Sequence, residues 1–520
     1  MNARFKSADE SELSCSDGLA ALEDRLREDL ERLCLPAQDW LARPADDPVL
    51  DVAIVGGGMA GLAAAAQLWL LGVRRIRVFD RNPVGAAGPW VTHARMETLR
   101  SPKELVGPAL GLPSLTFRAW YEAQFGESGW HALGRIPRKQ WQDYLNWFRI
   151  VLSLPVSHRV RVEAIAADTP VGHHGGTEGS LVAFDVVSDN ETSLASSSNA
   201  PDSGRQRLQA RHLVLATGMD GLGGPAIPEI ANAIPSNRWH HSSEQIDFAA
   251  LQGRRIGIVG GGDSALDAAA TALEAGAARV DVFARGRDFA RINFWKAFAH
   301  PGHYHGFAAM SPESRQPMLD FLKRQKVPPA FGTVQRVARF PNISLHFDSP
   351  IESLAVDADG ALAMSSPHGR FVVDDLIFAT GYCTDLSLRP ELAALAPHIR
   401  FWSDRTPAHE AAFALNGFPE TAADFSLIER EPGVCPVLAR VHLFTGAALM
   451  SQGKLTGDIP GIGLGSERLA RGIVARLYED DFSAQLQAVQ AYDELEVRGD
   501  EWAGICAESI GSAEQPANDT

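Results

Sequence analysis

Hydrophobic and polar positions along the chain predict two copies of one strand–turn–helix–strand unit. In the first copy the apolar run 49–55 precedes a glycine-rich turn, and in the second copy the corresponding run is 255–259. A helical stretch follows each turn and ends at a glycine sixteen positions after the first glycine of the turn, Gly72 in one copy and Gly276 in the other. A second apolar strand then follows in both copies. The copies align without a gap, so we expect an α/β fold built from two related units.

Weaker patterns predict elements outside these units. Leucines at helical spacing within residues 17–35 predict an amphipathic helix that packs on the outside of the first unit. A short apolar run at 181–187 interrupts a polar stretch between 173 and 205, which predicts a hairpin with long surface loops. The polar residues from Ser509 onward are typical of a frayed tail.

Two further buried strands end in the same Ala-Thr-Gly tripeptide, at Gly218 and Gly381, and they bracket the second unit. This order predicts two nested Rossmann-like dinucleotide-binding domains with an N-terminal helical extension. The predicted parts are a helical extension, a discontinuous first domain, an inserted second domain and a flexible tail: residues 1–47, 48–221 with 375–508, 222–374, and 509–520.

Composition narrows the class of protein. The 520 residues carry 64 acidic and 48 basic side chains, and the resulting net charge of −16 argues against a nucleic-acid surface. No apolar run has the length of a membrane-spanning helix, and the polar start lacks the apolar core of a signal peptide. We therefore expect no membrane partner and a cytoplasmic location.

The five cysteines are scattered and form no Cys-x-x-Cys pair and no metal-ligand spacing. Flavin enzymes that reduce disulfides place a cysteine pair shortly after their first glycine turn, and here that region is Gly85–Trp90, so this chemistry is disfavoured. Three histidines, His300, His303 and His305, lie in an Ala/Gly-rich segment that we interpret as a polar loop, and no metal is predicted.

Both glycine turns match a dinucleotide fingerprint, in which glycines let the backbone approach a pyrophosphate at the positive end of a helix. The candidate cofactor contacts are Gly56, Gly58, Met59, Ala60 and Gly61 in the first turn and Gly260, Gly262, Asp263, Ser264 and Ala265 in the second.

The residue at the end of the second strand predicts which nucleotide each unit binds. Asp80, followed by Arg81, ends this strand in the first unit, and a carboxylate there accepts hydrogen bonds from an adenosine ribose. Ala284 occupies the matching place in the second unit and precedes Arg285 and Arg287, which leaves room and charge for a 2′-phosphate. We predict FAD in the first unit and NADPH in the second. Further predicted cofactor contacts are Gly218, Gly381 and Asp458, the last in a glycine-rich segment that opens a final helix.

Several blocks then resemble the class B flavin-dependent monooxygenases, and most closely their N-hydroxylating branch. The resemblance covers most of residues 48–475 and rests on four segments: Asp374 with Phe378–Tyr382, His241–Glu244, Ile292–Pro301, and Trp90–Leu105. Departures include Ser387, where the branch has His or Pro, and Thr98, where it has Gln. The Baeyer–Villiger signature is not met, because Pro235 and Asn237 stand where it has Phe and Gly.

The resemblance implies a monooxygenase that forms a C4a-hydroperoxyflavin and oxygenates a heteroatom, most readily nitrogen, of a small metabolite with molecular oxygen. It implies that Asn293 holds the nicotinamide near the flavin, that Trp90 faces the flavin, and that Lys103 anchors a substrate carboxylate. An exposed helix lysine is the alternative interpretation of Lys103.

Two other functions stay open. A plain FAD reductase that passes electrons from NADPH to a protein or quinone acceptor needs the same two nucleotide sites and nothing more. A binding protein without turnover is hard to reconcile with two intact sites. The sequence leaves the substrate and the oligomeric state open.

Overall fold

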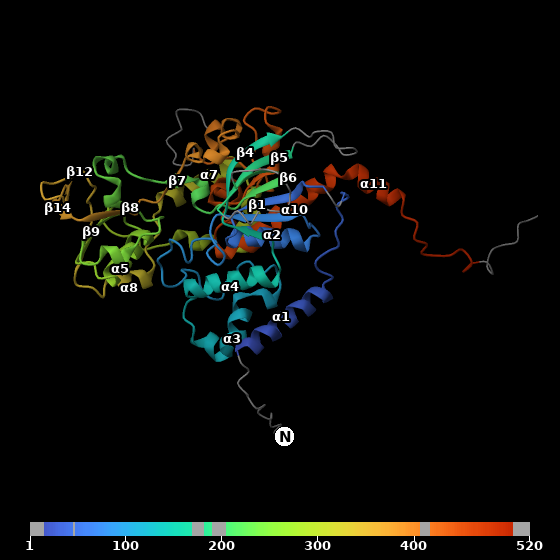
Figure 1. The fold of residues 1–520 in the computed structure, drawn as a ribbon, viewed down its shortest axis with the longest axis horizontal. Helices are drawn as coiled ribbons and strands as arrows, with labels where there is room; N and C mark the ends of the chain where they lie inside the picture. The colour runs from blue at the N-terminus through green and yellow to red at the C-terminus, as the bar shows by residue number, and fades with distance from the viewer. Residues whose placement is uncertain (1–14, 45–46, 169–180, 190–203, 406–416, 503–520) are drawn as a thin grey trace, which may run out of the picture.

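The computed structural model describes residues 15–44, 47–168, 181–189, 204–405 and 417–502. Two α/β units lie beside each other in Figure 1, with β1, β6 and α2 in the central unit and β9 and α5 in the unit at the left. Helices α1, α3 and α4 form a third group below the central unit. The predicted surface loops fall largely outside the described residues, and the predicted tail 509–520 does so entirely.

The larger sheet has the strand order β3-β2-β1-β6-β5-β4, and β17 pairs with β6 beside this path. Strands β3, β2, β1, β6 and β17 run parallel, whereas β4, β5 and β6 form an antiparallel meander. The long strand β6 pairs with β5 along its first half and with β1 and β17 along its second half. Its strands are β1 (Leu50–Val55), β2 (Ile76–Asp80), β3 (Val156–His158), β4 (Val160–Asp168), β5 (Leu181–Ser188), β6 (Arg205–Leu215) and β17 (Val441–Leu443).

The second sheet is fully parallel, in the order β11-β10-β9-β15-β8. Its strands are β8 (Trp239–His241), β9 (Arg255–Val259), β10 (Arg279–Phe283), β11 (Ile343–His346) and β15 (Asp375–Phe378). An antiparallel sheet packs beside it and consists of β12 (Ser353–Val356), β13 (Leu362–Ser366) and β14 (Gly369–Val373). The two connections between the units pair with each other as β7 (Gly223–Pro225) and β16 (Tyr382–Thr384).

The glycine turns occupy equivalent places in the two units. A Cβ added to Gly57 would lie 3.2 Å from the Asp80 Cβ, and a Cβ added to Gly261 would lie 3.2 Å from the Ala284 Cβ. The structure therefore places Asp80 and Ala284 at matching positions, as the gapless alignment of the two copies predicts.

The Ala-Thr-Gly strands are equivalent as well, and this changes one predicted boundary. A Cβ on Gly56 would lie 2.4 Å from the Ala216 carbonyl oxygen, and a Cβ on Gly260 would lie 2.4 Å from the Ala379 carbonyl oxygen. Strand β15 therefore occupies the same place beside β9 in the second unit that β6 occupies beside β1 in the first. Because β15 pairs with β9, the inserted domain extends through β15 and does not end at residue 374 as predicted.

Helices α2 (Met59–Leu70) and α5 (Asp263–Glu274) begin at the two glycine turns, and each is followed by a glycine with φ of +88°, Gly72 and Gly276. A left-handed residue of this kind ends a helix with little strain only if it is glycine. The other helices are α1 (Cys15–Arg32), α3 (Phe117–Ala132), α4 (Arg138–Val151), α6 (Pro301–Gly306), α7 (Pro312–Arg324), α8 (Phe331–Val337), α9 (Leu449–Gln452), α10 (Ile459–Asp480) and α11 (Phe482–Gln490).

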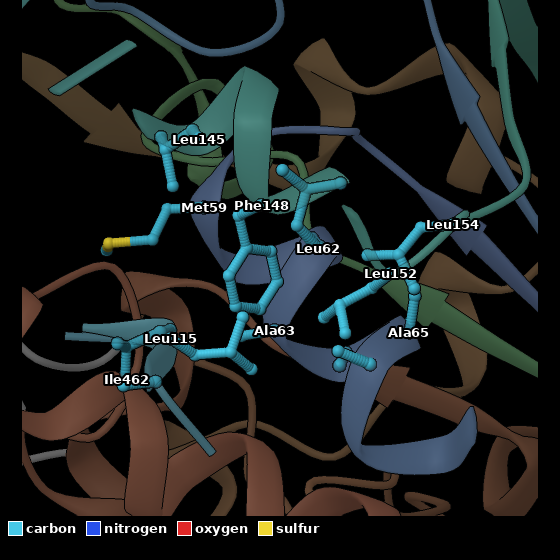
Figure 2. Close-up of a cluster of buried hydrophobic side chains, with 14 of the residues drawn as sticks. Met59, Leu62, Ala63, Ala65, Leu115, Leu145, Phe148, Leu152, Leu154 and Ile462 are labelled. Carbon is cyan, nitrogen blue, oxygen red and sulfur yellow. The ribbon is translucent and has the colours of Figure 1, made fainter. Parts of the chain in front are cut away.

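Helix α2 is the centre of the largest hydrophobic cluster. Figure 2 shows Met59, Leu62 and Ala63 of α2 close to Phe148 of α4 and to Ile462 of α10. The small side chains of α2 allow close approach, and each large side chain buried here contributes about 1.5–3 kcal/mol.

The predicted N-terminal amphipathic helix is confirmed as α1. Its Leu22 and Leu26 are buried in the same cluster as α2, whereas Leu33, just past its end, is 58% exposed. Within the described residues, no helix combines the length and apolar character needed to cross a membrane.

Candidate functional site

A cavity of about 1350 Å³ lies where the carboxyl ends of the first-unit strands face the second unit. This edge is where parallel α/β sheets bind ligands. The predicted site residues that line the cavity are Gly56, Gly58, Met59, Ala60, Asp80, Arg81, Trp90, Gly218, Asn293 and Asp458.

The first glycine turn shapes one end of this cavity. Gly56 has φ of +105°, and a Cβ on Gly58 would lie 3.4 Å from the Cα of Gly88, so larger residues would strain or crowd the turn at this end of the cavity. Gly61 does not line the cavity. Its absent Cβ lets the start of α2 pack against the turn, since that atom would lie 1.8 Å from the Gly56 carbonyl oxygen.

The Asp80 carboxylate is buried and held by the backbone. Its Oδ2 accepts from the Gly57 N–H at 2.7 Å, and its Oδ1 accepts from the Asn82 N–H at 2.8 Å. Each oxygen keeps a lone pair for a further donor, so the carboxylate suits the two hydroxyls of a ribose.

Trp90 presents a buried hydrogen-bond donor in the lining of the cavity. The indole Nε1–H of Trp90 is buried and has no acceptor among the described residues. A buried donor without a partner costs free energy unless a bound group accepts from it. The ring packs edge-on against Trp141 of α4 at 6.4 Å between centroids, which fixes its orientation.

The two Ala-Thr-Gly turns lie at the junction of the units. Gly218 lines the cavity with φ of +69°, and Gly381 has φ of +84° but contributes only through its neighbour Tyr382. Arg81 forms an ion pair with Asp220 at 2.7 Å, and burial raises the pKa of Tyr382 to about 12.

A wall of the cavity that faces Asn293 includes residues that the sequence analysis missed. The Asn293 Oδ1 accepts from the Trp295 N–H at 3.2 Å and begins a short 3-10 helix. Lys454 forms an ion pair with Asp458 at 2.8 Å, and its Nζ lies 6.0 Å from the Trp295 ring centroid. Trp295 and Lys454 both line the cavity. Trp295 lies within the segment Ile292–Pro301 but received no predicted role there, and Lys454 lies far away in the sequence.

His93 is a third residue that the sequence analysis missed. Its ring lines the cavity, and burial lowers its pKa below the ordinary value, although Asp220 nearby opposes this effect. The imidazole is therefore neutral at neutral pH and able to accept a proton.

The second glycine turn lies outside this cavity, at the start of α5. Asp263 pairs with Arg100 of the first unit and accepts from the Ala330 N–H, and burial raises its pKa. A Cβ on Gly262 would meet open space, so a ligand has access to the turn. Ser264 and Ala265 continue the helix, and Ala265 is buried.

Arg285 and Arg287 follow the end of β10 and are exposed, with the Arg287 side chain 92% accessible. Arg287 approaches Asp348 only at 4.0 Å. Both guanidinium groups are thus available to a phosphate at this end of the second sheet.

Lys103 does not lie in the cavity, which contradicts its predicted role as a substrate anchor. Its Nζ donates to the carbonyl oxygens of Trp130 at 2.5 Å and Leu133 at 2.6 Å and lies 4.7 Å from the Trp130 ring centroid. These contacts use two of the three N–H donors of the ammonium group. Lys103 instead ties the 90–105 loop to the end of α3.

Two histidines near α6 accept hydrogen bonds from backbone N–H groups. The His300 Nδ1 accepts from the His303 N–H at 3.3 Å, and the His303 Nε2 accepts from the Lys454 N–H at 3.4 Å. Burial lowers the pKa of His303 to about 4, so it is neutral. Nowhere in the described residues do three such side chains gather as a metal site would require.

Each of the two sheets carries one glycine turn, and the first turn opens into a cavity that both units line. This arrangement is that of an oxidoreductase with two dinucleotide sites. A protein-family model described as pyridine nucleotide-disulphide oxidoreductase matches residues 50–300. The chain is 38% identical over 487 residues to the FAD-dependent urate hydroxylase of Xanthomonas campestris pv. campestris, with 92% of this chain and 98% of that protein covered. The chain therefore belongs to the family of that urate hydroxylase.

Solved structures agree on the fold. The ornithine N-hydroxylase of Kutzneria sp. 744 superposes with a TM-score of 0.63 at 19% identity and covers 82% of this chain and 100% of its own. The ornithine hydroxylase of Pseudomonas aeruginosa superposes with a TM-score of 0.62 at 18% identity and the same coverage. These matches confirm the predicted two-domain dinucleotide fold.

Proposed function

We propose that this protein is an FAD- and NADPH-dependent monooxygenase that hydroxylates urate or a closely related oxidised purine with molecular oxygen. One observation carries the proposal: a single cavity extends from the first glycine turn and Asp80 to Asn293 of the second unit. The substrate class follows from the relative of 38% identity, which is a urate hydroxylase. The predicted cytoplasmic location, where NADPH is available, is part of the proposal.

The residues present fit both nucleotides. Asp80 would bind the ribose of FAD, and the turn from Gly56 would approach the FAD pyrophosphate. The Trp90 Nε1–H, which has no acceptor among the described residues, would donate a hydrogen bond to FAD. Arg285 would bind the 2′-phosphate of NADPH. Bound FAD supplies the redox and oxygen-activating chemistry.

The protein's own part is to position the substrate and to exclude water. Asn293 and Trp295 bring the second unit against the cavity, so the reacting space is enclosed by both units. His93 lines the same cavity with a neutral imidazole, which would accept a proton from the substrate.

Oxygenation of nitrogen is the predicted outcome for this site. Urate also offers an electron-rich carbon–carbon double bond between its rings, so the position of the new oxygen must be measured. Carbon and nitrogen NMR of the product would assign it.

The experiment uses the purified FAD-loaded enzyme with NADPH, urate and isotopically labelled oxygen gas. We expect urate to accelerate NADPH oxidation, with one oxygen molecule consumed per NADPH and one labelled atom in the product. If urate changes neither rate nor product, and a quinone or protein acceptor accelerates NADPH oxidation, the enzyme is a reductase and the proposal is wrong.

A further inference from the structure

Trp295 and Lys454 lie next to each other in the lining of the cavity, with the Lys454 Nζ 6.0 Å from the Trp295 ring centroid. Trp295 follows the short turn at Asn293 in the second unit, and Lys454 lies in the first unit, shortly after β17 and α9. The wall is thus assembled only when the two units are in place.

Its chemistry selects for flatness and negative charge. The indole of Trp295 is half-buried and lines the cavity, and the Lys454 Nζ lies 6.0 Å from its ring centroid, so a planar ring stacked on this indole would come close to the ammonium. The Lys454 ammonium has three N–H donors and uses one side of the group for Asp458, so donors are left for an anionic oxygen.

Asn293 adds polar groups beside the ring. Its side-chain oxygen is used by the Trp295 N–H, and its amide nitrogen has no acceptor among the described residues. An amide N–H₂ held in this way suits a carbonyl oxygen at the edge of a heterocycle.

The wall is held from behind by His303. Its Nε2 accepts from the Lys454 N–H, and a Cβ on Gly453 would lie 2.9 Å from this ring nitrogen. Gly453 has φ of +73°, so the turn before Lys454 requires glycine for both its conformation and this close approach. His303 therefore acts as a positioning residue for Lys454.

We infer that Trp295 and Lys454 form the substrate subsite, in which a planar anionic heterocycle of the urate type stacks on the indole and places an oxygen on the ammonium. This inference rests on the proposed function and names the residues that select the substrate. An aliphatic amine such as a basic amino acid would gain no stacking here, and its charge would oppose Lys454. The subsite therefore replaces Lys103, which the structure withdraws from the cavity.

The test is equilibrium binding of urate to the oxidised FAD-loaded enzyme, measured by titration calorimetry without NADPH. Trp295→Leu should raise Kd for urate about 10- to 100-fold, the range expected for loss of one stacked ring, whereas Trp295→Phe should stay within a few-fold of wild type. Lys454→Met should raise Kd about tenfold and remove most of the dependence of binding on salt. Lys139→Met, an exposed lysine on α4, is the matched control.

The possible outcomes distinguish a failure of the proposed function from a failure of the proposed subsite. If wild-type enzyme neither binds nor oxidises urate, the proposed function is wrong and the subsite with it. If wild-type enzyme does both, but the Trp295→Leu and Lys454→Met variants bind urate as tightly, only the subsite is wrong. Should Trp295→Leu fail to retain FAD, the Trp295→Phe and Lys454→Met variants still decide the question.

Discussion

At the scale of single residues, Lys103 shows how a motif position can keep its residue type and lose its predicted role. The lysine donates to two carbonyl oxygens at the end of α3 and lies over Trp130. Lys103→Met should lower the free energy of unfolding by about 1–3 kcal/mol, because two charge-assisted hydrogen bonds are lost. The KM for urate should stay within twofold of wild type. Urea denaturation and steady-state kinetics, with Lys139→Met as control, check both effects; a raised KM with unchanged stability would restore the anchor role.

Arg285 tests the choice of nucleotide in the second unit. Its exposed guanidinium follows β10 next to Ala284, where the first unit has Asp80. Arg285→Ala should raise the apparent KM for NADPH roughly 5- to 150-fold, which corresponds to the loss of about 1–3 kcal/mol from a charge-assisted hydrogen bond. The KM for NADH should stay nearly unchanged. Arg370→Ala, an exposed arginine on β14, is the control. Equal effects on both nucleotides would contradict the assignment.

At the scale of elements, β6 and β17 are joined by a pair of fully buried histidines. The His442 Nδ1–H donates to the Asp424 carbonyl oxygen at 2.8 Å, so its Nε2 is free to accept from the His212 Nδ1–H at 3.0 Å. The His212 Nε2 then accepts from Arg440 at 3.2 Å. The His442 Nε2 and the His212 Nε2 can accept these hydrogen bonds only when they carry no proton, so both imidazoles are neutral in this arrangement. Burial accordingly lowers the pKa of His442 to about 4 and that of His212 well below its ordinary value.

This pair makes stability depend on pH. Both imidazoles are neutral in the folded protein, while the unfolded chain takes up their protons below about pH 6.5. The stabilisation that the neutral histidines give the folded protein is therefore complete above pH 6.5. As the pH falls from 6.5 toward 4, the free energy of unfolding decreases by up to about 1.4 kcal/mol per pH unit for each histidine. Denaturation at pH 7, 6 and 5 should show a smaller pH slope for His442→Gln than for wild type. An unchanged slope would mean that other groups set the acid sensitivity.

The elements also show what the sequence could and could not predict. The two glycine turns, their helices and the contrast of Asp80 with Ala284 follow from local spacing, so they were predictable. The sheet to which β15 belongs was not, because a buried apolar run has the same pattern in either sheet. The wall at Trp295 and Lys454 was not predictable for another reason: its residues meet only through the packing of the two units.

At the scale of the whole molecule, the loop between Trp90 and Arg100 joins the two units. Arg95 donates to the carbonyl oxygens of Ser242 and Glu244 in the second unit. In return, Arg336 of α8 donates to the Arg95 carbonyl oxygen at 3.0 Å. The loop that carries Trp90 and His93 into the cavity is therefore held against the second unit by the side chain and by the carbonyl oxygen of Arg95.

Arg336 is the buried centre of this junction, with its side chain only 5% exposed. It pairs with Asp267 at 3.3 Å and with Glu274 at 2.7 Å, and the pKa of Asp267 is raised to about 6, chiefly by burial. Arg336→Met would leave these carboxylates without their partner, so the free energy of unfolding should fall by about 3–5 kcal/mol. The loosened loop should also admit water and increase the hydrogen peroxide formed per NADPH. Arg339→Met, an exposed arginine two residues past α8, should change neither quantity in urea denaturation and peroxide assays; stability and peroxide yield that match wild type in Arg336→Met would show that the junction does not depend on this ion pair.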